Sequence, residues 1–360
     1  MSLDPRQPYN DLPLLPPQCE LETKPILKKC VAANRALAEL KGAGDLIPNQ
    51  AMLINAIPLQ EAKLSSEIEN IVTTQDALFQ AALDESRVTD PATKEVLRYR
   101  TALRRGFKAV QTEPFRLSLL EELCGVLRHE KVKFRADEGV YIGDPAAKTI
   151  TYTPPRGAEV MRAKLKNLEE FLLGQDELDP LVRMAAAHYQ FEAIHPFTDG
   201  NGRTGRILNI LFLIHAGLLR IPVLYLSRHL IQNKAEYYRL LRGVTERGEW
   251  EQWVSFILTG VEETATWTTG RILAIRDLFE QTLARCRAKL PPKVYSKELV
   301  ELLFTQPYTK IQFLVDAGIA QRQTASEYLQ ELEKIGILKA EKRGRDVLYK
   351  NPALLKILTA

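Results

Sequence analysis

The side chains best suited to chemistry lie in residues 195–206, which read His-Pro-Phe-Thr-Asp-Gly-Asn-Gly-Arg-Thr-Gly-Arg. His195 has an ordinary pKa near neutrality, so it can take a proton from an incoming hydroxyl. Asp199 supplies a hard oxygen ligand of the kind that holds Mg²⁺ together with substrate phosphates. Arg203 and Arg206, three positions apart on one helical turn, can both donate to phosphate oxygens. A base, a metal ligand and two cations at this spacing predict chemistry on a phosphate group.

An apolar run of helical length precedes this stretch. Residues 181–194 predict a helix that ends before Pro196, because proline disfavours the α region for the residue that precedes it. His195 would then lie at a helix end and face a loop. A single histidine before a proline is usually structural, so the chemical prediction depends on the whole set of residues.

A second helix should follow the glycine-rich loop. Residues 207–219 continue this helix, which we expect to begin near Gly202 or Arg203, with Asn201 close to its cap position. Gly200 and Gly202 would let the backbone approach a ligand closely. Backbone N–H groups and the positive end of the helix dipole would point at that ligand, so the loop predicts an anion site.

At every fixed position, residues 195–206 resemble the signature of the Fic (filamentation induced by cAMP) family, His-Pro-Phe-x-Asp/Glu-Gly-Asn-Gly-Arg-x-x-Arg. The resemblance implies a protein adenylyltransferase, which moves AMP from ATP to a Tyr, Thr or Ser hydroxyl of a target protein. It implies that His195 is the catalytic base and that Asp199 holds Mg²⁺. The nucleotide would be bound by the residues that follow: Gly200, Asn201, Gly202, Arg203, Thr204, Gly205 and Arg206.

The signature leaves several variants open. Some relatives use other nucleotides, move other phosphate-containing groups, or reverse the reaction and remove AMP. The sequence does not exclude these variants, and it leaves the target, self-modification and a homodimer open.

A second string, Ser65-Ser66-Glu67-Ile68-Glu69-Asn70, lies on a short helix that we expect over 60–73. Taken alone, Glu69 is a solvated helix charge. The string is similar to the inhibitory signature of Fic proteins, Ser/Thr-x-x-x-Glu-Gly/Asn, and it precedes the main motif, as in the class with an N-terminal inhibitory helix. Ser65 and Glu69 are neighbours on one helix face. The resemblance pairs Glu69 with Arg206, so we expect a buried fork between carboxylate and guanidinium that holds the protein inactive.

The hydrophobic period changes to that of strands after residue 138. Residues 139–143 and 149–153 are rich in β-branched and aromatic types and are joined through Asp144 and Pro145, which predicts a hairpin. An inert hairpin at the edge of a helical domain is the plainer interpretation. In Fic proteins a hairpin in this place, the flap, clamps the target by strand addition, so the resemblance implies that the target protein docks on 140–153.

Tyr237 and Tyr238 lie near the start of a helix that we expect to begin at Lys234, after a turn over 230–233. Paired tyrosines usually pack in a core or on a surface. The resemblance places adenine-facing aromatic positions here, which makes both tyrosines candidate nucleotide contacts. An asparagine that some members carry eight residues after the first tyrosine is Thr245 here.

Length and composition predict a globular protein with more than one domain. The 360 residues are 45% apolar and 26% charged, and this length predicts about two or three domains. The cysteines lack metal-ligand spacing and predict reduced thiols; they are Cys19, Cys30, Cys124 and Cys286. Residues 1–17 lack the apolar run of a signal peptide, and no later run reaches membrane-spanning length free of charge. We therefore expect a cytoplasmic protein without membrane contact.

Helical patterns fill most of the remaining chain. The proline-rich residues 4–17 should be irregular, and Gly42-Ala43-Gly44-Asp45 should end the first helix. The expected helices cover residues 21–40, 92–110, 115–128, 157–173, 250–262 and 266–290.

Pro291-Pro292 is the expected boundary of a C-terminal module. Helices over 296–306, 310–315 and 321–335, followed by a basic hairpin over 337–351, resemble a winged helix-turn-helix. The fold class is therefore a mainly helical Fic-type domain with a hairpin flap and a C-terminal winged helix. The expected domains are an N-terminal helical segment with the inhibitory helix (1–90), a Fic catalytic core (91–290) and a winged-helix domain (291–360).

A second interpretation is a DNA-binding regulator in which the Fic domain senses ATP. From Arg271 onward the chain holds 16 basic and 10 acidic residues, so the net charge of +4 is concentrated at this end. DNA would contact residues 321–346, through Arg322, Gln323, Thr324 and Ser326 on the recognition helix and Lys342, Arg343 and Arg345 on the wing. Acidic residues on the same helix weaken this interpretation; they are Glu327, Glu331 and Glu333.

Overall fold

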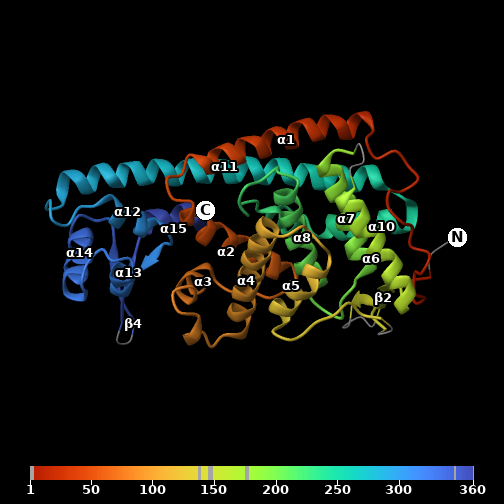
Figure 1. Cartoon of the computed structure of the whole chain (residues 1–360), viewed down its shortest axis with the longest axis horizontal. Helices are drawn as coiled ribbons and strands as arrows, with labels where there is room; N and C mark the ends of the chain where they lie inside the picture. Colours follow the sequence, from red (N-terminus) through yellow and green to blue (C-terminus); the bar gives the residue numbers. More distant parts are fainter. Residues whose placement is uncertain (1–3, 137–138, 145–148, 175–177, 344–345, 360) are drawn as a thin grey trace.

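The computed structural model describes residues 4–136, 139–144, 149–174, 178–343 and 346–359. The described chain is mainly helical, with one two-stranded and one three-stranded sheet (Figure 1), which confirms the predicted mainly helical class. The helices are α1 (Lys24–Asp45), α2 (Ala51–Ile68), α3 (Gln75–Ala81), the 3₁₀ turn η1 (Glu85–Arg87), α4 (Pro91–Thr112), α5 (Ser118–Arg128), α6 (Ala158–Leu173), α7 (Pro180–Ile194), α8 (Asn201–His215), α9 (Leu226–Gln232), α10 (Lys234–Arg247), α11 (Trp250–Lys289), α12 (Lys297–Phe304), α13 (Ile311–Asp316), α14 (Arg322–Lys334) and α15 (Pro352–Thr359). The strands are β1 (Ile142–Asp144), β2 (Thr149–Tyr152), β3 (Tyr308–Thr309), β4 (Lys339–Arg343) and β5 (Asp346–Lys350).

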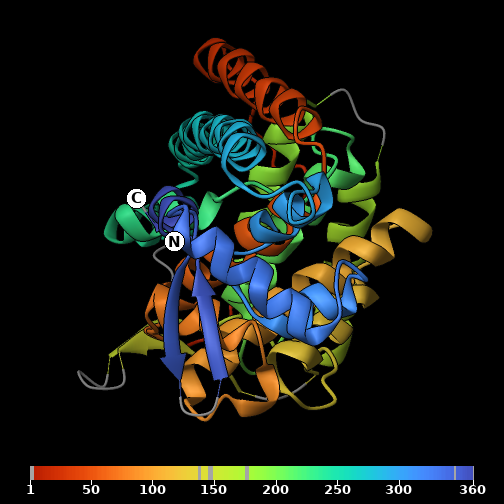
Figure 2. The ribbon, with the colours of Figure 1, turned by 90° about the vertical axis from the view of Figure 1, so that its left-hand side faces the viewer.

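The longest element, α11, is a single helix of 40 residues that runs along the molecule with α1 beside it (Figures 1 and 2). The prediction of two helices over 250–262 and 266–290 is wrong. The hydroxyl of Thr264 donates to the carbonyl of Gly260 at 2.5 Å, and that of Thr268 donates to the carbonyl of Thr264 at 2.7 Å. Because these β-branched residues satisfy their hydroxyls within the helix and are buried, the helix continues through them.

The expected end of the first helix at residues 42–45 is also wrong. α1 continues to Asp45, and both Ala43 and Gly44 are buried in it. A Cβ atom on Gly44 would lie 3.8 Å from Cδ1 of Ile221, so the glycine faces a packed neighbour rather than solvent. Packing against the core here outweighs the low helix propensity of glycine.

α2 begins nine residues before the predicted start at residue 60 and ends at Ile68, where residue 73 was expected. It contains Pro58, which removes a helical hydrogen bond, but buried side chains on either side of this proline hold the helix in place. Glu69 is the C-cap residue, and Asn70 adopts a left-handed conformation with φ 63°. Asparagine and glycine tolerate this conformation at a helix end. This explains why the position after Glu69 in the inhibitory signature is glycine or asparagine.

α7 and α8 pack together at the centre of the molecule. α4 and α5 cover α8, α6 and α11 cover α7, and α2 reaches α8 on its own side (Figures 1 and 2). Most residues of α7 are buried, so its sequence is apolar around nearly its whole circumference. The turn expected over 230–233 is mostly helix, because α9 extends to Gln232. The short helix α3 was not predicted.

The predicted hairpin is present, with strands shorter than expected. β1 and β2 are antiparallel, with Ile142 opposite Tyr152 and Asp144 opposite Thr149; residues 145–148, including Pro145, lie outside the described residues. The hydroxyl of Tyr152 donates to the carbonyl of Ala193 at 2.8 Å, and the N–H of Tyr9 donates to the carbonyl after β2. The hairpin is thus fastened to the end of α7 and to the N-terminal segment. This segment is irregular, as predicted.

The C-terminal elements agree with the predicted three helices and hairpin. α12, α13 and α14 precede β4 and β5, and β3 completes a sheet with the order β3-β5-β4. β3 and α15 were not predicted, and Gly344 and Arg345 of the expected wing lie outside the described residues. Tyr308 of β3 is buried, and its hydroxyl donates to the carboxylate of Asp76 on α3. α15 packs on α11, so this module contacts both α3 and α11 of the preceding chain.

All four cysteines are free thiols, as predicted. Among the described residues, none of the helices combines the length and the apolar character needed to span a bilayer.

Candidate active site

The loop from His195 to Gly200 joins α7 to α8. α7 ends at Ile194, as Pro196 predicts, and His195 is its cap residue with left-handed backbone angles of φ 51° and ψ 60°. Gly200 is the cap residue of α8 with φ 85°, and Asn201 is the first helical residue. The Asn201 side chain accepts from the N–H of Phe197 and donates to its carbonyl, both at 2.8 Å. This amide therefore closes the loop into one fixed turn.

His195 is held in a state suited to a general base. Its Nδ1 lies 3.3 Å from the carbonyl oxygen of Glu192. Because a carbonyl can only accept, Nδ1 carries the proton and Nε2 keeps a free electron pair. Burial lowers the pKa of His195 to about 4, so the imidazole is neutral at pH 7. Arg135 fixes the backbone of this turn by donating to the carbonyls of His195 at 2.7 Å and Ile194 at 2.8 Å.

Arg206 is buried against α2, where Glu69 was predicted to meet it. Its Nη2 donates to Glu69 Oε1 at 2.8 Å and to the Ser65 carbonyl at 2.9 Å, while its Nε donates to Ser65 Oγ at 2.7 Å. The pairing of Glu69 with Arg206 was predicted, but the predicted fork of two hydrogen bonds is wrong. Only Nη2 of Arg206 donates to Glu69, because its Nε donates to Ser65 instead. A Cβ atom on Gly202 would collide with Glu69 Oε1, so the carboxylate occupies the space at the start of α8 where an anion would bind.

Arg203 has a partner that the sequence did not reveal. Its Nη1 donates to Glu95 Oε2 of α4 at 2.9 Å, and the Arg203 side chain is only 5% exposed. In the sequence Glu95 is one of many helix charges, and only the packing of α4 on α8 brings it to the site. Both arginines of the motif are therefore paired with carboxylates from other helices.

Asp199 points outward from the loop, and 62% of its side chain is exposed. Its Oδ2 lies 2.6 Å from Arg128 Nη1, and its Oδ1 accepts from the Gly200 N–H at 2.6 Å. Arg128 also contacts Glu130, and sequence analysis identified neither residue. The described residues contain no group of three or more His, Cys, Asp or Glu side chains that could hold a metal. A single exposed carboxylate fits Mg²⁺ that takes its other ligands from phosphates and water.

The two tyrosines proposed to face adenine differ in position. Tyr237 is buried, and its hydroxyl lies 3.0 Å from His188 Nε2 within a cluster of aromatic rings. Tyr238 is 45% exposed, so its ring is the one open to a ligand. Oγ1 of Thr245 lies 3.0 Å from the Tyr189 hydroxyl, so this hydroxyl group contacts another side chain of the protein.

Two more residues near the site were missed by sequence analysis. The Oε1 atom of Glu192 is buried without a hydrogen-bond partner among the described residues, and a Cβ atom on Gly205 would lie 2.7 Å from it. Burial raises the pKa of Glu192 to about 7, and the charge of Arg206 opposes that rise. Lys234 donates to the Ile68 carbonyl at 2.6 Å, so α10 holds the end of the helix that carries Glu69. A lone Glu and a lone Lys carry no sequence signal of these contacts.

Three family models match the chain. They are described as "Fic/DOC family N-terminal" (residues 27–108), "Fic/DOC family" (residues 107–213) and "Protein adenylyltransferase SoFic-like, C-terminal domain" (residues 278–354). The first two adjoin and together match more than half of the chain. The last match includes the end of α11 with the C-terminal module.

Relatives and solved structures agree with these models. The protein adenylyltransferase fic-1 of Caenorhabditis elegans is 35% identical over 105 residues, which cover 29% of this chain and 19% of that protein. The protein adenylyltransferase Fic of Nematostella vectensis is 31% identical over 112 residues, or 31% of this chain and 25% of that protein. These matches span a quarter or less of each relative.

A Fic family protein from Desulfovibrio desulfuricans has a similar structure with a TM-score of 0.56 and 19% sequence identity. The similarity covers 91% of this chain and 96% of that chain, so it extends over the helical core and the C-terminal module. At this identity it is evidence of a common fold. Together with the loop around His195 and the adjoining family models, it shows that the chain belongs to the Fic/DOC family.

Proposed function

We propose that this protein is an adenylyltransferase that moves AMP from ATP to a hydroxyl side chain of a target protein. The observation that carries the proposal is the neutral His195 imidazole, with Nε2 free, next to the glycine-rich start of α8. A base for a hydroxyl and an anion site for a triphosphate are the two parts that such a reaction needs. The names of the curated relatives support the same activity.

In the proposed reaction, His195 Nε2 takes the proton of the target hydroxyl. The hydroxyl oxygen attacks the α-phosphorus of ATP, the bond from that phosphorus to the bridging oxygen breaks, and pyrophosphate leaves with the electron pair. Backbone N–H groups at the start of α8 and the guanidiniums of Arg203 and Arg206 would bind the phosphate oxygens. Asp199 would hold Mg²⁺, which neutralises charge on the phosphates when it is bound.

Binding of the target segment to β1 and β2 is the second part of the proposal. The hydroxyl of Tyr152 fastens β2 to the Ala193 carbonyl, two residues before His195. A strand added to the hairpin would therefore lie at a fixed distance from the base.

The proposal is tested by incubating the protein with cell lysate and α-labelled ATP, and in parallel with labelled UTP, GTP and CTP. We expect label from ATP to appear on protein bands. If only another labelled nucleotide gives labelled bands, the proposed activity would be transfer of that nucleoside monophosphate instead of AMP. Release of AMP from pre-modified protein, without any labelling, would show the reverse reaction.

Asp199→Ala should lower AMP transfer and flatten its dependence on Mg²⁺, because the protein would lose its metal carboxylate. A Mg²⁺ titration of initial labelling rates measures this effect. Thr198→Ala is the matched control, since Thr198 is an exposed neighbour in the same loop. A Mg²⁺ response equal to that of the wild type would remove Asp199 from metal binding.

We propose residues 291–360 as a module that selects the target rather than a part of the catalytic unit. A chain that ends at Leu290 should keep intrinsic transfer or self-modification and lose or change its preferred target, because 195–206, 65–69 and the hairpin all precede the cut. Labelling of lysate measures this, with circular dichroism as the check of folding. A folded but inactive chain would make the module part of the catalytic unit. Tyr308→Phe removes the hydrogen bonds of this hydroxyl to Asp76 and Gln80, both on α3, and so isolates the effect of that contact.

No observation favours DNA binding through 321–346. Arg322 and Gln323 are exposed at the start of α14, but Glu327 and Glu331 lie on the same helix. Arg345, one of the three wing residues expected to reach DNA, lies outside the described residues.

A further inference from the structure

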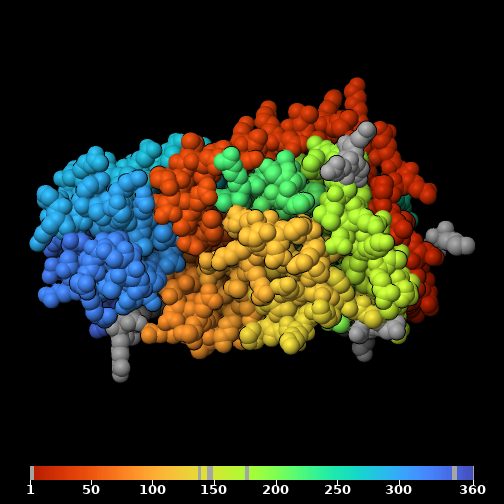
Figure 3. All heavy atoms as spheres, viewed as in Figure 1, coloured from red at the N-terminus to blue at the C-terminus, as the bar shows by residue number. Residues whose placement is uncertain are grey.

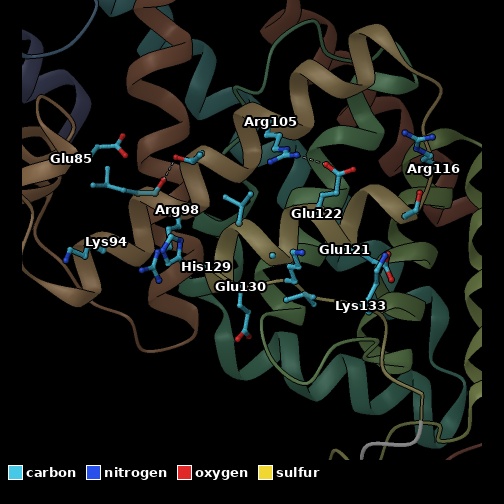
Figure 4. A pocket seen from close by; sticks show the side chains of 17 residues that line it. Glu85, Lys94, Arg98, Arg105, Arg116, Glu121, Glu122, His129, Glu130 and Lys133 are labelled. Carbon is cyan, nitrogen blue, oxygen red and sulfur yellow. Dashed lines mark hydrogen bonds and ion pairs between the residues drawn. The ribbon is translucent and has the colours of Figure 1, made fainter.

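A groove with a volume of about 960 Å³ lies between α4 and α5 and is bounded by η1 and by residues 129–133 (Figure 4). We refer to it as the α4–α5 groove. α4 and α5 reach the surface on the face shown in Figure 3, in orange and yellow. The groove is separate from the loop 195–200, and none of the residues proposed for the reaction lines it.

Every carboxylate that lines the groove is part of an ion pair within the protein. Each makes an ion pair: Glu85 with Arg100, Glu121 with Lys133, Glu122 with Arg105 and Glu130 with Arg128. These acidic side chains therefore leave little negative field in the groove.

Several cations in the groove have no such partner. Lys94, Arg98 and Lys131 line it and make no ion pair with an acidic residue in the part of the chain that the structure describes. In Figure 4 the side chains of Lys94, Arg98 and His129 gather at one end of the groove. Lys94 and Arg98 are four positions apart on α4, where two like charges repel each other. This end of the groove is thus an uncompensated positive site.

The walls of the groove also contact the candidate active site. Glu95, which lies between Lys94 and Arg98 in the sequence, holds Arg203 on the other side of α4. Arg128, the residue before His129, holds Asp199. A segment bound in the groove would therefore lie against the helices whose side chains hold Arg203 and Asp199.

We propose that the α4–α5 groove binds an acidic polypeptide segment of the protein that is modified. This inference rests on the proposed function, because it names the substrate of the same site. Carboxylates of the segment would pair with Lys94, Arg98 and Lys131, while its backbone N–H groups would meet the paired glutamates along the walls. A nucleic acid fits less well, because its sugar-phosphate backbone has no N–H groups to donate to the paired glutamates.

The first experiment measures binding and needs no AMP transfer. Fluorescein-labelled hexaglutamate is titrated with the full-length protein and followed by anisotropy, with hexaglutamine as the uncharged probe. We expect hexaglutamate to bind and to weaken as salt rises, because the contacts are exposed charges. Lys94→Glu with Arg98→Glu should weaken binding at least about tenfold. Lys131→Glu, a change in an exposed loop, tests the same site without altering α4.

The matched control is Lys24→Glu with Lys28→Glu. These lysines are also exposed and four positions apart on a helix, but they lie on α1. We expect this control to change binding by less than about twofold, since net charge changes equally in both pairs. An equal loss in both pairs, or no loss in either, would overturn the groove as the site. Tighter binding of single-stranded oligothymidylate than of hexaglutamate at the same salt would also overturn it.

A second arm measures label transfer from ATP to lysate proteins with the same variants. Weaker labelling of target bands by the Lys94→Glu/Arg98→Glu variant than by the α1 control supports the groove as a target site. Equal labelling by both variants would overturn the assignment to the target. If the wild type labels nothing, the proposed reaction fails, while the anisotropy titration still decides whether the groove binds an acidic segment.

Discussion

Replacement of His195 by alanine should abolish AMP transfer and leave ATP binding largely intact. The imidazole is proposed to act on the target hydroxyl, whereas the phosphates would be held by the start of α8 and by Arg203 and Arg206. Loss of a general base costs about 10²- to 10⁴-fold in rate. Initial rates with α-labelled ATP measure the loss, and titration calorimetry with ATP measures the binding. His215→Ala, an exposed histidine at the other end of α8, is the control.

The pH profile gives an independent check on the same residue. Burial lowers the pKa of His195 to about 4. The unprotonated form is the active base, so kcat/KM should be flat from about pH 6 to 8 and fall only on acidification toward the lowered pKa. Bound phosphates favour the protonated imidazole, so kcat should begin to fall at a higher pH than kcat/KM. Normal labelling by the alanine variant would remove His195 from the mechanism.

Glu69→Gly should raise the rate of AMP transfer by about tenfold or more, because it would remove the group that misplaces the triphosphate. In the structure the Glu69 carboxylate lies 2.8 Å from Arg206 Nη2 and fills the space above Gly202. We propose that a triphosphate bound beside it would have its γ-phosphate displaced, which would leave the α-phosphorus out of line with the hydroxyl. A displacement of about 1 Å can cost on the order of 10²-fold in rate. Initial labelling rates at saturating ATP and Mg²⁺ measure the release.

Three controls separate this release from general loosening of the protein. Glu67→Gly removes an acid two positions earlier, which forms a partly exposed pair with Lys63, and should change the rate by less than about twofold. Glu69→Gly combined with His195→Ala should be silent. Arg206→Ala should not mimic activation, because it removes a phosphate donor. If the Glu69→Gly variant labels targets no faster than the wild type, the proposal of autoinhibition is wrong. Release of AMP from pre-modified target would then be measured, to test whether Glu69 takes part in AMP removal.

The loop and the helices around it could be predicted because their signals are local. Pro196 ends α7 through sterics with the residue before it, and the glycine-rich loop leads into α8, although the left-handed cap is Gly200 rather than the expected Asn201. The approach of Glu69 to Arg206 could be predicted only through family resemblance, since the residues lie 137 positions apart in the chain. Its geometry could not, because the second bond goes to Ser65 once α2 packs on α8.

The remaining partners depend on tertiary packing. Glu95 and Arg128 are ordinary helix charges in the sequence, and they reach Arg203 and Asp199 only because α4 and α5 cover α8. The length of α11 was missed for a related reason. Its threonines have low helix propensity, but burial against neighbouring helices and hydroxyl bonds one turn back outweigh that preference.

The contact between Glu69 and Arg206 lies within one chain, and this has a consequence for control by concentration. In the autoinhibition that we propose, an intramolecular carboxylate would compete with the γ-phosphate at an effective concentration set by the connecting structure, so dilution of the protein should leave the competition unchanged. Arg206 also donates to Ser65, so a ligand that displaces α2 must replace three hydrogen bonds. Only an increase in the nucleotide, or a partner that binds α2 in its displaced position, would shift the balance by mass action.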